Sequence, residues 1–111
     1  MEPVRTREEI VSRLTELREE IGAAGVARLA LFGSFRRDEA GSDSDVDFLV
    51  VFRPGDKSYS NLFQLSALLQ RALGRPVELV TPESLNPRLR SQILEEAEFV
   101  EGLPAIHRPH S

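Results

Sequence analysis

The sequence predicts a single small α+β domain. Its 111 residues, 41% of them hydrophobic, are enough to enclose one core but too few for two domains of ordinary size. Segments with hydrophobic residues at helical spacing alternate with short runs of branched and aromatic residues that are typical of strands. We therefore expect one domain over residues 1–101. Residues 102–111 contain two prolines and no hydrophobic period, so we expect a C-terminal tail there.

The first expected element is an amphipathic helix over residues 6–23. Thr6 followed three residues later by Glu9 has the form of a capping box, in which each side chain binds a backbone N–H at the start of a helix. Isoleucine and leucine side chains then recur every three or four residues, as on one face of a helix. Glycines at positions 22 and 25 end this pattern.

Two strands are expected next. Residues 27–32 form a short apolar run that is typical of a mostly buried strand, and Gly33 then provides a turn. Residues 46–52 give the strongest strand signal in the chain, because branched and aromatic residues dominate them. Both faces of this strand become apolar from Phe48 onward, which places it centrally in a sheet.

The second half of the chain is expected to contain two helices separated by a strand. Leucines at helical spacing predict a helix over residues 62–73, and the apolar run at 77–81 predicts a short strand. Asn86 followed by Pro87 is a favourable helix start, with a capping residue before a proline in the first helical position. We expect this last helix to end near Glu98.

The composition excludes several classes of protein. The chain has no cysteine, so disulfide frameworks and thiolate zinc sites are ruled out. No apolar run approaches the roughly 18–20 residues needed to span a bilayer, and the N-terminus has no signal-peptide pattern, so we expect a cytoplasmic protein. A net charge of −4 disfavours non-specific binding to nucleic acid, whereas a small phosphorylated ligand remains compatible with it.

We expect the functional site where Gly33-Ser34 is followed, after ten intervening residues, by Asp45 and Asp47. Residues two apart on a strand project to the same face, so these two carboxylates stand side by side. Like charges held this close repel unless a cation lies between them. Carboxylate oxygens suit Mg²⁺ or Mn²⁺, which complete their coordination with water and substrate phosphates.

Gly33 and Ser34 complement the acidic pair. A glycine lets the backbone approach a phosphate closely, and the turn that follows offers unpaired amides and a hydroxyl. Arg36 and Arg37 lie just beyond, where a guanidinium group could bind phosphate oxygens in bidentate fashion.

Glu78 is a third acidic candidate, since it interrupts a short apolar strand. If this strand neighbours the central one, the Glu78 carboxylate could complete a metal site or accept a proton from an attacking hydroxyl. The other interpretation is structural, because alternation on an edge strand places every second side chain in solvent.

Residues 29–52 resemble the signature of the minimal nucleotidyltransferases in the DNA polymerase beta superfamily, and residues 76–85 resemble that family's third-carboxylate strand. Together with the flanking helices, the likeness covers residues 6–100. It implies a palm-like nucleotidyltransferase fold, which is a small mixed β-sheet with helices packed mainly on one face. It also implies transfer of a nucleoside monophosphate from a triphosphate to a hydroxyl, with release of pyrophosphate.

The same resemblance implies roles for individual residues. Asp45 and Asp47 would be catalytic ligands of Mg²⁺ or Mn²⁺, and Glu78 would take the third catalytic and metal-binding position. The triphosphate would be bound by Gly33 and Ser34, with Arg37 beside it. Two departures from the family pattern are Glu78, where an aspartate is more common, and Gly41, where many relatives carry a basic residue.

Many small proteins of this type resemble the antitoxin partners of HEPN-domain ribonuclease toxins. The resemblance implies that this chain transfers AMP from ATP to a hydroxyl of such a toxin, with tyrosine as the expected acceptor. An alternative is a binding module that neutralises its partner by contact alone. A third possibility, an aminoglycoside-type or tRNA-type transferase, is weaker because such enzymes usually need additional acceptor-binding domains.

Overall fold

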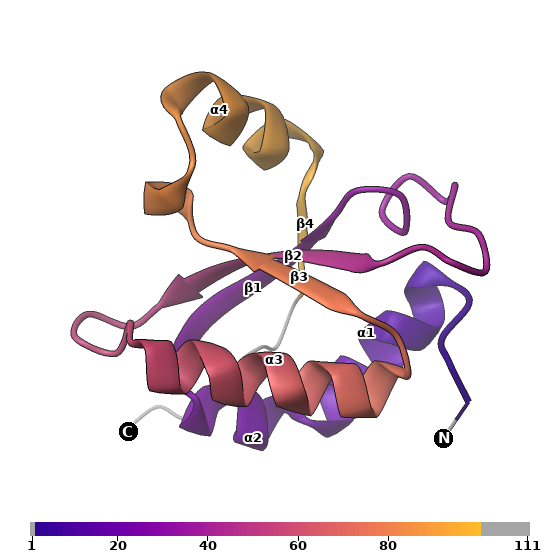
Figure 1. Cartoon of the computed structure of the whole chain (residues 1–111), viewed down its shortest axis with the longest axis horizontal. Helices are drawn as coiled ribbons and strands as arrows, with labels where there is room; N and C mark the ends of the chain where they lie inside the picture. Colours follow the sequence, from indigo (N-terminus) through magenta and orange to yellow (C-terminus); the bar gives the residue numbers. More distant parts are fainter. Residues whose placement is uncertain (1, 101–111) are drawn as a thin grey trace.

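A four-stranded mixed sheet forms the centre of the computed structural model, which describes residues 2–100 (Figure 1). The sheet order is β3-β2-β1-β4. Strand β2 pairs antiparallel with β1 and parallel with β3, and β4 pairs antiparallel with β1. The strand bounds are β1, Val26–Phe32; β2, Val46–Phe52; β3, Val77–Val80; and β4, Glu98–Phe99. The expected mixed sheet and the interior position of residues 46–52 are therefore confirmed.

Three of the four helices cover one face of the sheet. Figure 1 shows α1, α2 and α3 together on one side, whereas α4 lies on the other. This arrangement confirms the expectation that the helices pack mainly on one face. The helix bounds are α1, Arg7–Glu16; α2, Arg18–Ala23; α3, Tyr59–Leu73; and α4, Pro87–Glu96, with a short 3₁₀ turn, η1, at Pro82–Ser84.

The hydrophobic core lies between the sheet and these three helices. Every second residue of a strand points into this core. The helices contribute residues spaced three or four apart, which lie on one helix face. On the sheet side the fully buried members include Leu29, Leu31, Val46, Phe48 and Val50; on the helix side they include Ile10, Leu14, Ile21, Leu65, Leu69 and Leu73. The residues between them on β2 must therefore face the opposite side of the sheet.

The N-terminal helix is interrupted, so the expectation of one continuous helix over residues 6–23 is wrong. α1 ends at Glu16 and α2 begins at Arg18, with the Leu17 N–H donating to the Leu14 carbonyl at 3.0 Å in a tightened turn. Leu14 before the break and Ile21 after it are both fully buried, so the break lets the chain follow the core.

The helix start is confirmed in part. The Thr6 hydroxyl accepts from the Glu9 N–H at 3.1 Å, as in a capping box. The Glu9 carboxylate, however, accepts from the Arg5 N–H at 2.6 Å rather than from Thr6. Its contact to the backbone is therefore one residue earlier than a capping box requires.

The last helix ends two residues earlier than expected. α4 stops at Glu96, Ala97 is extended, and Glu98–Phe99 pair with β1 as a fourth strand that the sequence pattern did not predict. Two further contacts hold this short strand against β1. The Val100 N–H donates to the Leu29 carbonyl at 2.9 Å, and the Arg28 guanidinium lies 3.8 Å from the centroid of the Phe99 ring.

The tail expected over residues 102–111 lies outside the described residues. Within residues 2–100, every helix is too short or too polar to cross a lipid bilayer.

The buried leucine row on α3 should dominate the stability of the domain. Leu69→Ala is expected to lower the free energy of unfolding by about 2–5 kcal/mol, because it leaves a cavity where a fully buried side chain met the sheet. Urea denaturation would measure this change. Leu94→Ala on α4, where the residue is 43% exposed, serves as the control and should cost less than about 1 kcal/mol. Equal losses in the two variants would contradict the described core.

Candidate functional site

Three acidic residues meet at one end of the sheet. Asp47 on β2 lies directly opposite Glu78 on the parallel strand β3, and Asp45 lies just before β2. Because Val46 and Phe48 are buried on the helix-covered face, Asp47 must project to the other face. The structure therefore brings together the three acids that the sequence singled out.

The pKa of Asp47 is shifted well above its ordinary value. Its pKa is raised from an ordinary value of 3.8 to about 6, first by burial and then by the neighbouring carboxylates of Glu78 and Asp45. The nearby guanidinium of Arg37 opposes this shift only in part. An ionised Asp47 is therefore under repulsion that a cation would relieve.

These acids suit a divalent cation that is completed by substrate. Within the described part of the chain, no group of three or more His, Cys, Asp or Glu side chains is placed so that it could hold a metal ion by itself. Mg²⁺ and Mn²⁺ do not require one, since they commonly bind one or two carboxylates and take their remaining oxygens from water and phosphates. The adjacent carboxylates of Asp45 and Asp47, with Glu78 beside them, fit this type of ion.

Gly33 lies directly against Asp47. It follows β1 in the left-handed backbone region, with φ of 80°, and a Cβ added there would overlap the Asp47 carboxylate and come within 3.1 Å of its Cγ. Only glycine meets both constraints. The absence of a side chain at position 33 thus allows the turn after β1 to touch the acidic group.

The turn after Gly33 is a single hydrogen-bonded loop. The Arg37 N–H donates to the Gly33 carbonyl at 3.1 Å, and the nearly fully buried ring of Phe35 anchors the turn in the core. Ser34 is half-buried, and its carbonyl accepts from the Glu39 N–H at 2.8 Å. Among residues 2–100, the N–H groups at positions 34–36 donate to no backbone carbonyl, which leaves them available to an anion.

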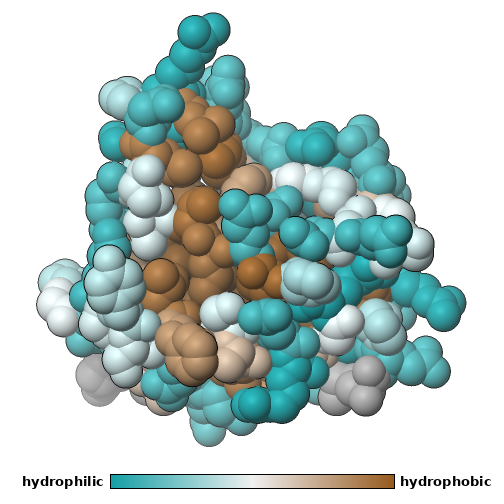
Figure 2. Space-filling model, in the orientation of Figure 1, coloured by the Kyte–Doolittle hydropathy of each residue, from teal (hydrophilic) through white to brown (hydrophobic). Residues whose placement is uncertain are grey.

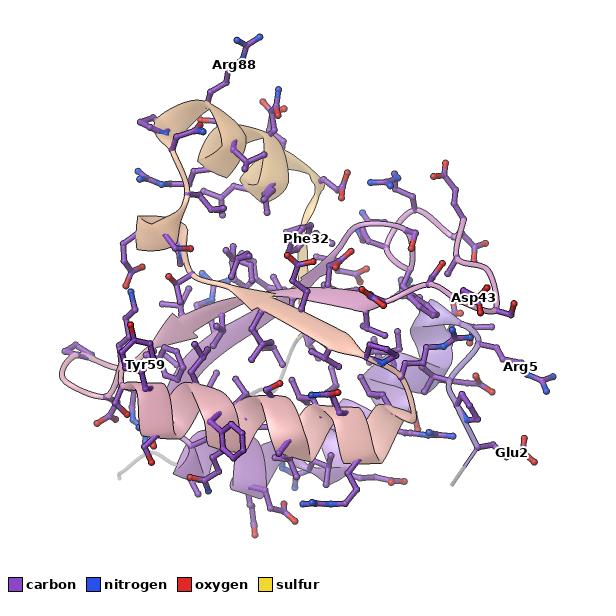
Figure 3. All side chains as sticks on the ribbon, viewed as in Figure 1. Glu2, Arg5, Phe32, Asp43, Tyr59 and Arg88 are labelled. Carbon is purple, nitrogen blue, oxygen red and sulfur yellow. The ribbon has the colours of Figure 1, made fainter. Side chains whose placement is uncertain are left out.

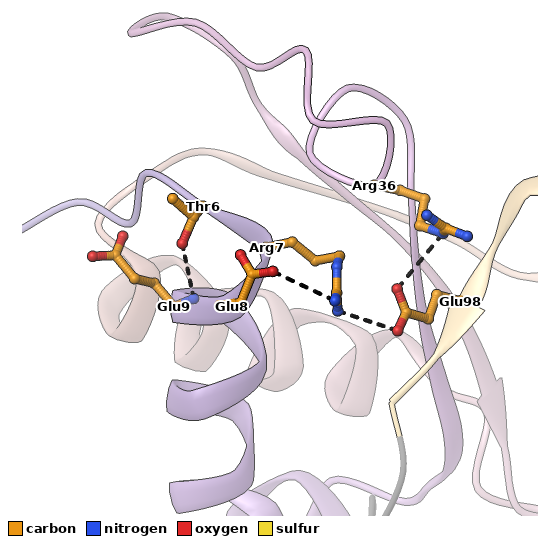
Figure 4. Close-up of polar contacts among 6 residues, drawn as sticks. All are labelled: Thr6, Arg7, Glu8, Glu9, Arg36 and Glu98. Atoms are coloured by element: carbon orange, nitrogen blue, oxygen red, sulfur yellow. Dashed lines mark hydrogen bonds and ion pairs between the residues drawn. The ribbon is translucent and has the colours of Figure 1, made fainter.

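Of the two arginines in this turn, only Arg37 faces the site. Its guanidinium donates to Glu96 at 2.9 Å and to Glu39 at 3.0 Å, and these hydrogen bonds raise the pKa of Arg37 above its usual value. Arg36 instead turns toward Glu98, with its Nε 3.6 Å from the carboxylate. Figure 4 shows Glu98 between Arg36 and Arg7, the latter at 3.2 Å.

Glu96 is a site residue that the sequence did not reveal. One of its carboxylate oxygens accepts from the Gly33 N–H at 2.6 Å while the other binds Arg37. No motif marks this residue, because its position depends on the unpredicted pairing of β4 with β1.

Arg75 is a second residue that the sequence analysis missed. It lies just after α3 and binds the loop that leads to Asp45, while its Nε donates to the Val4 carbonyl at 2.7 Å. Its Nη1 donates to three carbonyl oxygens of that loop, at 3.2, 2.9 and 3.2 Å: Gly41, Ser42 and Ser44. Arg75 therefore positions the acidic loop against the N-terminal segment.

An apolar hollow of about 470 Å³ lies elsewhere on the molecule. Its lining includes Tyr59, Leu62 and Leu79. Leu79 packs against the core, so it points to the face of β3 opposite Glu78. Figure 3 shows Tyr59 at the other end of the molecule from Asp43, which belongs to the acidic loop. The acids and the hollow are thus separate features.

The fold and the site define a class of protein: an α+β domain in which a glycine-serine turn faces a group of carboxylates. A family model described as "Nucleotidyltransferase domain" matches residues 11–100. The chain therefore belongs to this family, as a minimal nucleotidyltransferase of the DNA polymerase beta superfamily.

Individual proteins agree with this assignment. Protein adenylyltransferase MntA of Thermococcus cleftensis is 40% identical over 99 residues, which are 86% of this chain and 96% of that protein. The solved structure of a chain described as a minimal nucleotidyltransferase has a TM-score of 0.67 at 37% identity, covering 79% of this chain and 93% of that one. A chain in a toxin-antitoxin crystal structure with AMP-PNP has a TM-score of 0.60, covering 84% and 70%; its 22% identity shows the fold alone.

Arg75→Gln should loosen the acidic loop. The shorter neutral side chain cannot make the four hydrogen bonds, so amide hydrogen exchange over residues 41–45 is expected to accelerate at least about ten-fold. Hydrogen exchange read by mass spectrometry or NMR would measure this change. Arg88→Gln removes the same charge from a side chain that points away from α4 in Figure 3, and it should leave the loop unchanged. Unaltered exchange in the Arg75 variant would show that the loop is held by other contacts.

Asp47→Asn should stabilise the metal-free protein at neutral pH. The folded-state pKa of about 6 lies above the ordinary 3.8, so the protonated form is favoured in the fold; its stabilisation is complete below pH 3.8 and is lost as the pH rises through 6. We expect the variant to gain about 1 kcal/mol at pH 7.5, less than full linkage gives because solvent screens a partly exposed group.

Urea unfolding in EDTA between pH 4 and 8 tests this dependence. The difference between wild type and Asp47→Asn should grow from pH 4 until the pH passes the folded-state pKa of about 6, and should then stay constant. Asp43→Asn, at an exposed position in the same loop, provides the control. A difference that does not vary with pH would rule out a perturbed Asp47.

Proposed function

We propose that this minimal nucleotidyltransferase is metal-dependent and transfers AMP from ATP to a hydroxyl, with tyrosine as the expected acceptor, on a partner toxin of the HEPN type, thereby acting as an antitoxin. The observation that carries the proposal is the contact of Gly33 with Asp47, which itself stands beside Glu78. This contact supports the proposal because a phosphate held by the turn would lie beside carboxylates that suit a divalent cation.

Each part of the site has a proposed task in this reaction. Asp45 and Asp47 would hold Mg²⁺ or Mn²⁺, and Glu78 would take the third acidic position. When bound, the cations stabilise negative charge on the attacking and leaving oxygens. Gly33 and Ser34 would bind the triphosphate through the turn amides and hydroxyl, with Arg37 supplying positive charge beside it.

The transfer itself requires one bond to form and one to break. The acceptor hydroxyl oxygen bonds to the α-phosphorus of ATP while the bond to pyrophosphate breaks, so that AMP remains on the acceptor. The hydroxyl proton passes to a nearby base, a task for which Glu78 is a candidate because of its place beside Asp47. Holding the reactants in line is the main contribution of the protein.

The nature of the acceptor is supported by the relatives. The protein of Thermococcus cleftensis, similar over almost its full length, is named a protein adenylyltransferase. A structure of the same fold was solved as a toxin-antitoxin complex with AMP-PNP. These likenesses favour ATP as the donor and a toxin as the acceptor. The competing candidate, a module that inhibits its partner by contact alone, is separated from the enzyme by the experiment below.

The activity test uses the purified chain, ATP labelled on its α-phosphate, Mg²⁺ and the product of the adjacent gene, which is tested as the partner toxin. Label is expected to reach a tyrosine of the toxin. In Asp45→Asn/Asp47→Asn the rate should fall below about one hundredth of the wild-type rate, because loss of the metal ligands removes several kcal/mol of charge stabilisation.

Asp43→Asn is the matched control, since it removes a carboxylate from an exposed position two residues before Asp45. It should transfer AMP at close to the wild-type rate. If the wild type transfers no label, and the double variant still inhibits the toxin, the protein is a binding module instead.

A further inference from the structure

The Glu96 carboxylate binds two of the groups that the proposed function gives to the triphosphate. Its Oε2 accepts from the Gly33 N–H at 2.6 Å, and its Oε1 accepts from the Arg37 guanidinium at 2.9 Å. A backbone N–H at a glycine and an arginine fork are the donors that proteins commonly offer to phosphate oxygens. Glu96 thus makes, within the chain, the contacts expected of a bound anion.

Strand pairing places Glu96 at this position. β4 runs antiparallel to β1 with Glu98 opposite Leu31, so the residue two before Glu98 comes opposite the residue two after Leu31. That residue is Gly33. The ion pairs from Arg7 and Arg36 to Glu98, drawn in Figure 4, hold this register.

The contact forms between charged groups. Although burial by itself raises the pKa of Glu96, the hydrogen bond from Gly33 and the Arg37 guanidinium hold it below its ordinary value. The Glu96 charge also adds to the negative potential at Asp47. While Glu96 stays in place, the turn presents a carboxylate where an incoming phosphate needs positive charge.

The contact can be broken without unfolding the domain. No residue of α4, which ends at Glu96, is fully buried, and Leu89 and Leu94 on this helix are 41% and 43% exposed. Figure 2 shows apolar residues gathered between this helix and the sheet, in view of solvent. The Glu96 side chain is itself 29% exposed, so rotation about its own bonds can carry the carboxylate into water.

We propose that Glu96 is an intrachain competitor of the nucleotide: its carboxylate occupies the position of a triphosphate oxygen at Gly33 and Arg37 and must leave before the nucleotide binds. This inference rests on the proposed function. Glu96 thereby sets the affinity for nucleotide, and the apparent affinity falls with the fraction of molecules in which Glu96 stays bound.

Titration calorimetry of the full chain with AMP-PNP and Mg²⁺ tests the competition. Glu96→Gln keeps the shape of the side chain but removes its charge, so the variant is expected to bind AMP-PNP about ten-fold more tightly. Glu95→Gln is the matched control, because it removes the same charge from the neighbouring exposed residue of α4. Its Kd should stay within about two-fold of wild type.

Two further measurements separate competition from a structural role. In an Arg37→Gln background, the gain from Glu96→Gln should shrink below about three-fold, because one of the contested donors is gone. In NMR spectra of the wild type, the Gly33 amide and the Glu96 carboxylate should both shift as AMP-PNP is added. These signals report the exchange of partners directly.

Equal or weaker AMP-PNP binding by Glu96→Gln, with unchanged thermal unfolding, overturns the inference and makes Glu96 a positioning residue for Arg37. Tighter binding without AMP transfer to the toxin upholds the inference and leaves the proposed acceptor wrong. If AMP-PNP binds neither the wild type nor the variant, the proposed function fails and the inference fails with it.

Discussion

The site depends on the register of β2 between its two neighbours. Val46 and Phe48 are buried against the helices, so Asp47 between them must face the other side of the sheet. There it stands opposite Phe32 on β1 and Glu78 on β3. A slip of one residue would turn Asp47 into the core and a hydrophobic side chain outward, so burial of apolar area enforces the placement of the acid.

This arrangement carries an electrostatic cost that the chain offsets only in part. Asp47 has a pKa raised to about 6 by burial and by the carboxylates beside it, and Arg37 is shared with two glutamates. Perturbed carboxylates of this kind gather at sites that bind ions or perform catalysis. The domain maintains the cluster because the hydrophobic core on the opposite face of the sheet supplies the stability.

Sequence periodicity predicted the elements better than their ends. The strands at 27–32, 46–52 and 77–81 lie where β1, β2 and β3 are found, because branched and aromatic runs are a local signal. The break at Leu17 and the strand at Glu98–Phe99 were not predicted. Both depend on contacts with distant segments: the break follows the shape of the core, and a two-residue strand exists only through its pairing with β1.

The sequence by itself determined that a glycine-serine turn and three acids exist at spacings that suit a nucleotide and its cation, since alternation along a strand is a local property. The tertiary structure alone decided which groups meet. It turned Arg37 toward the site and Arg36 toward Glu98, and it brought Glu96 to Gly33. The physical reason is that these contacts join residues about sixty positions apart, and only the pairing of β4 with β1 makes them neighbours.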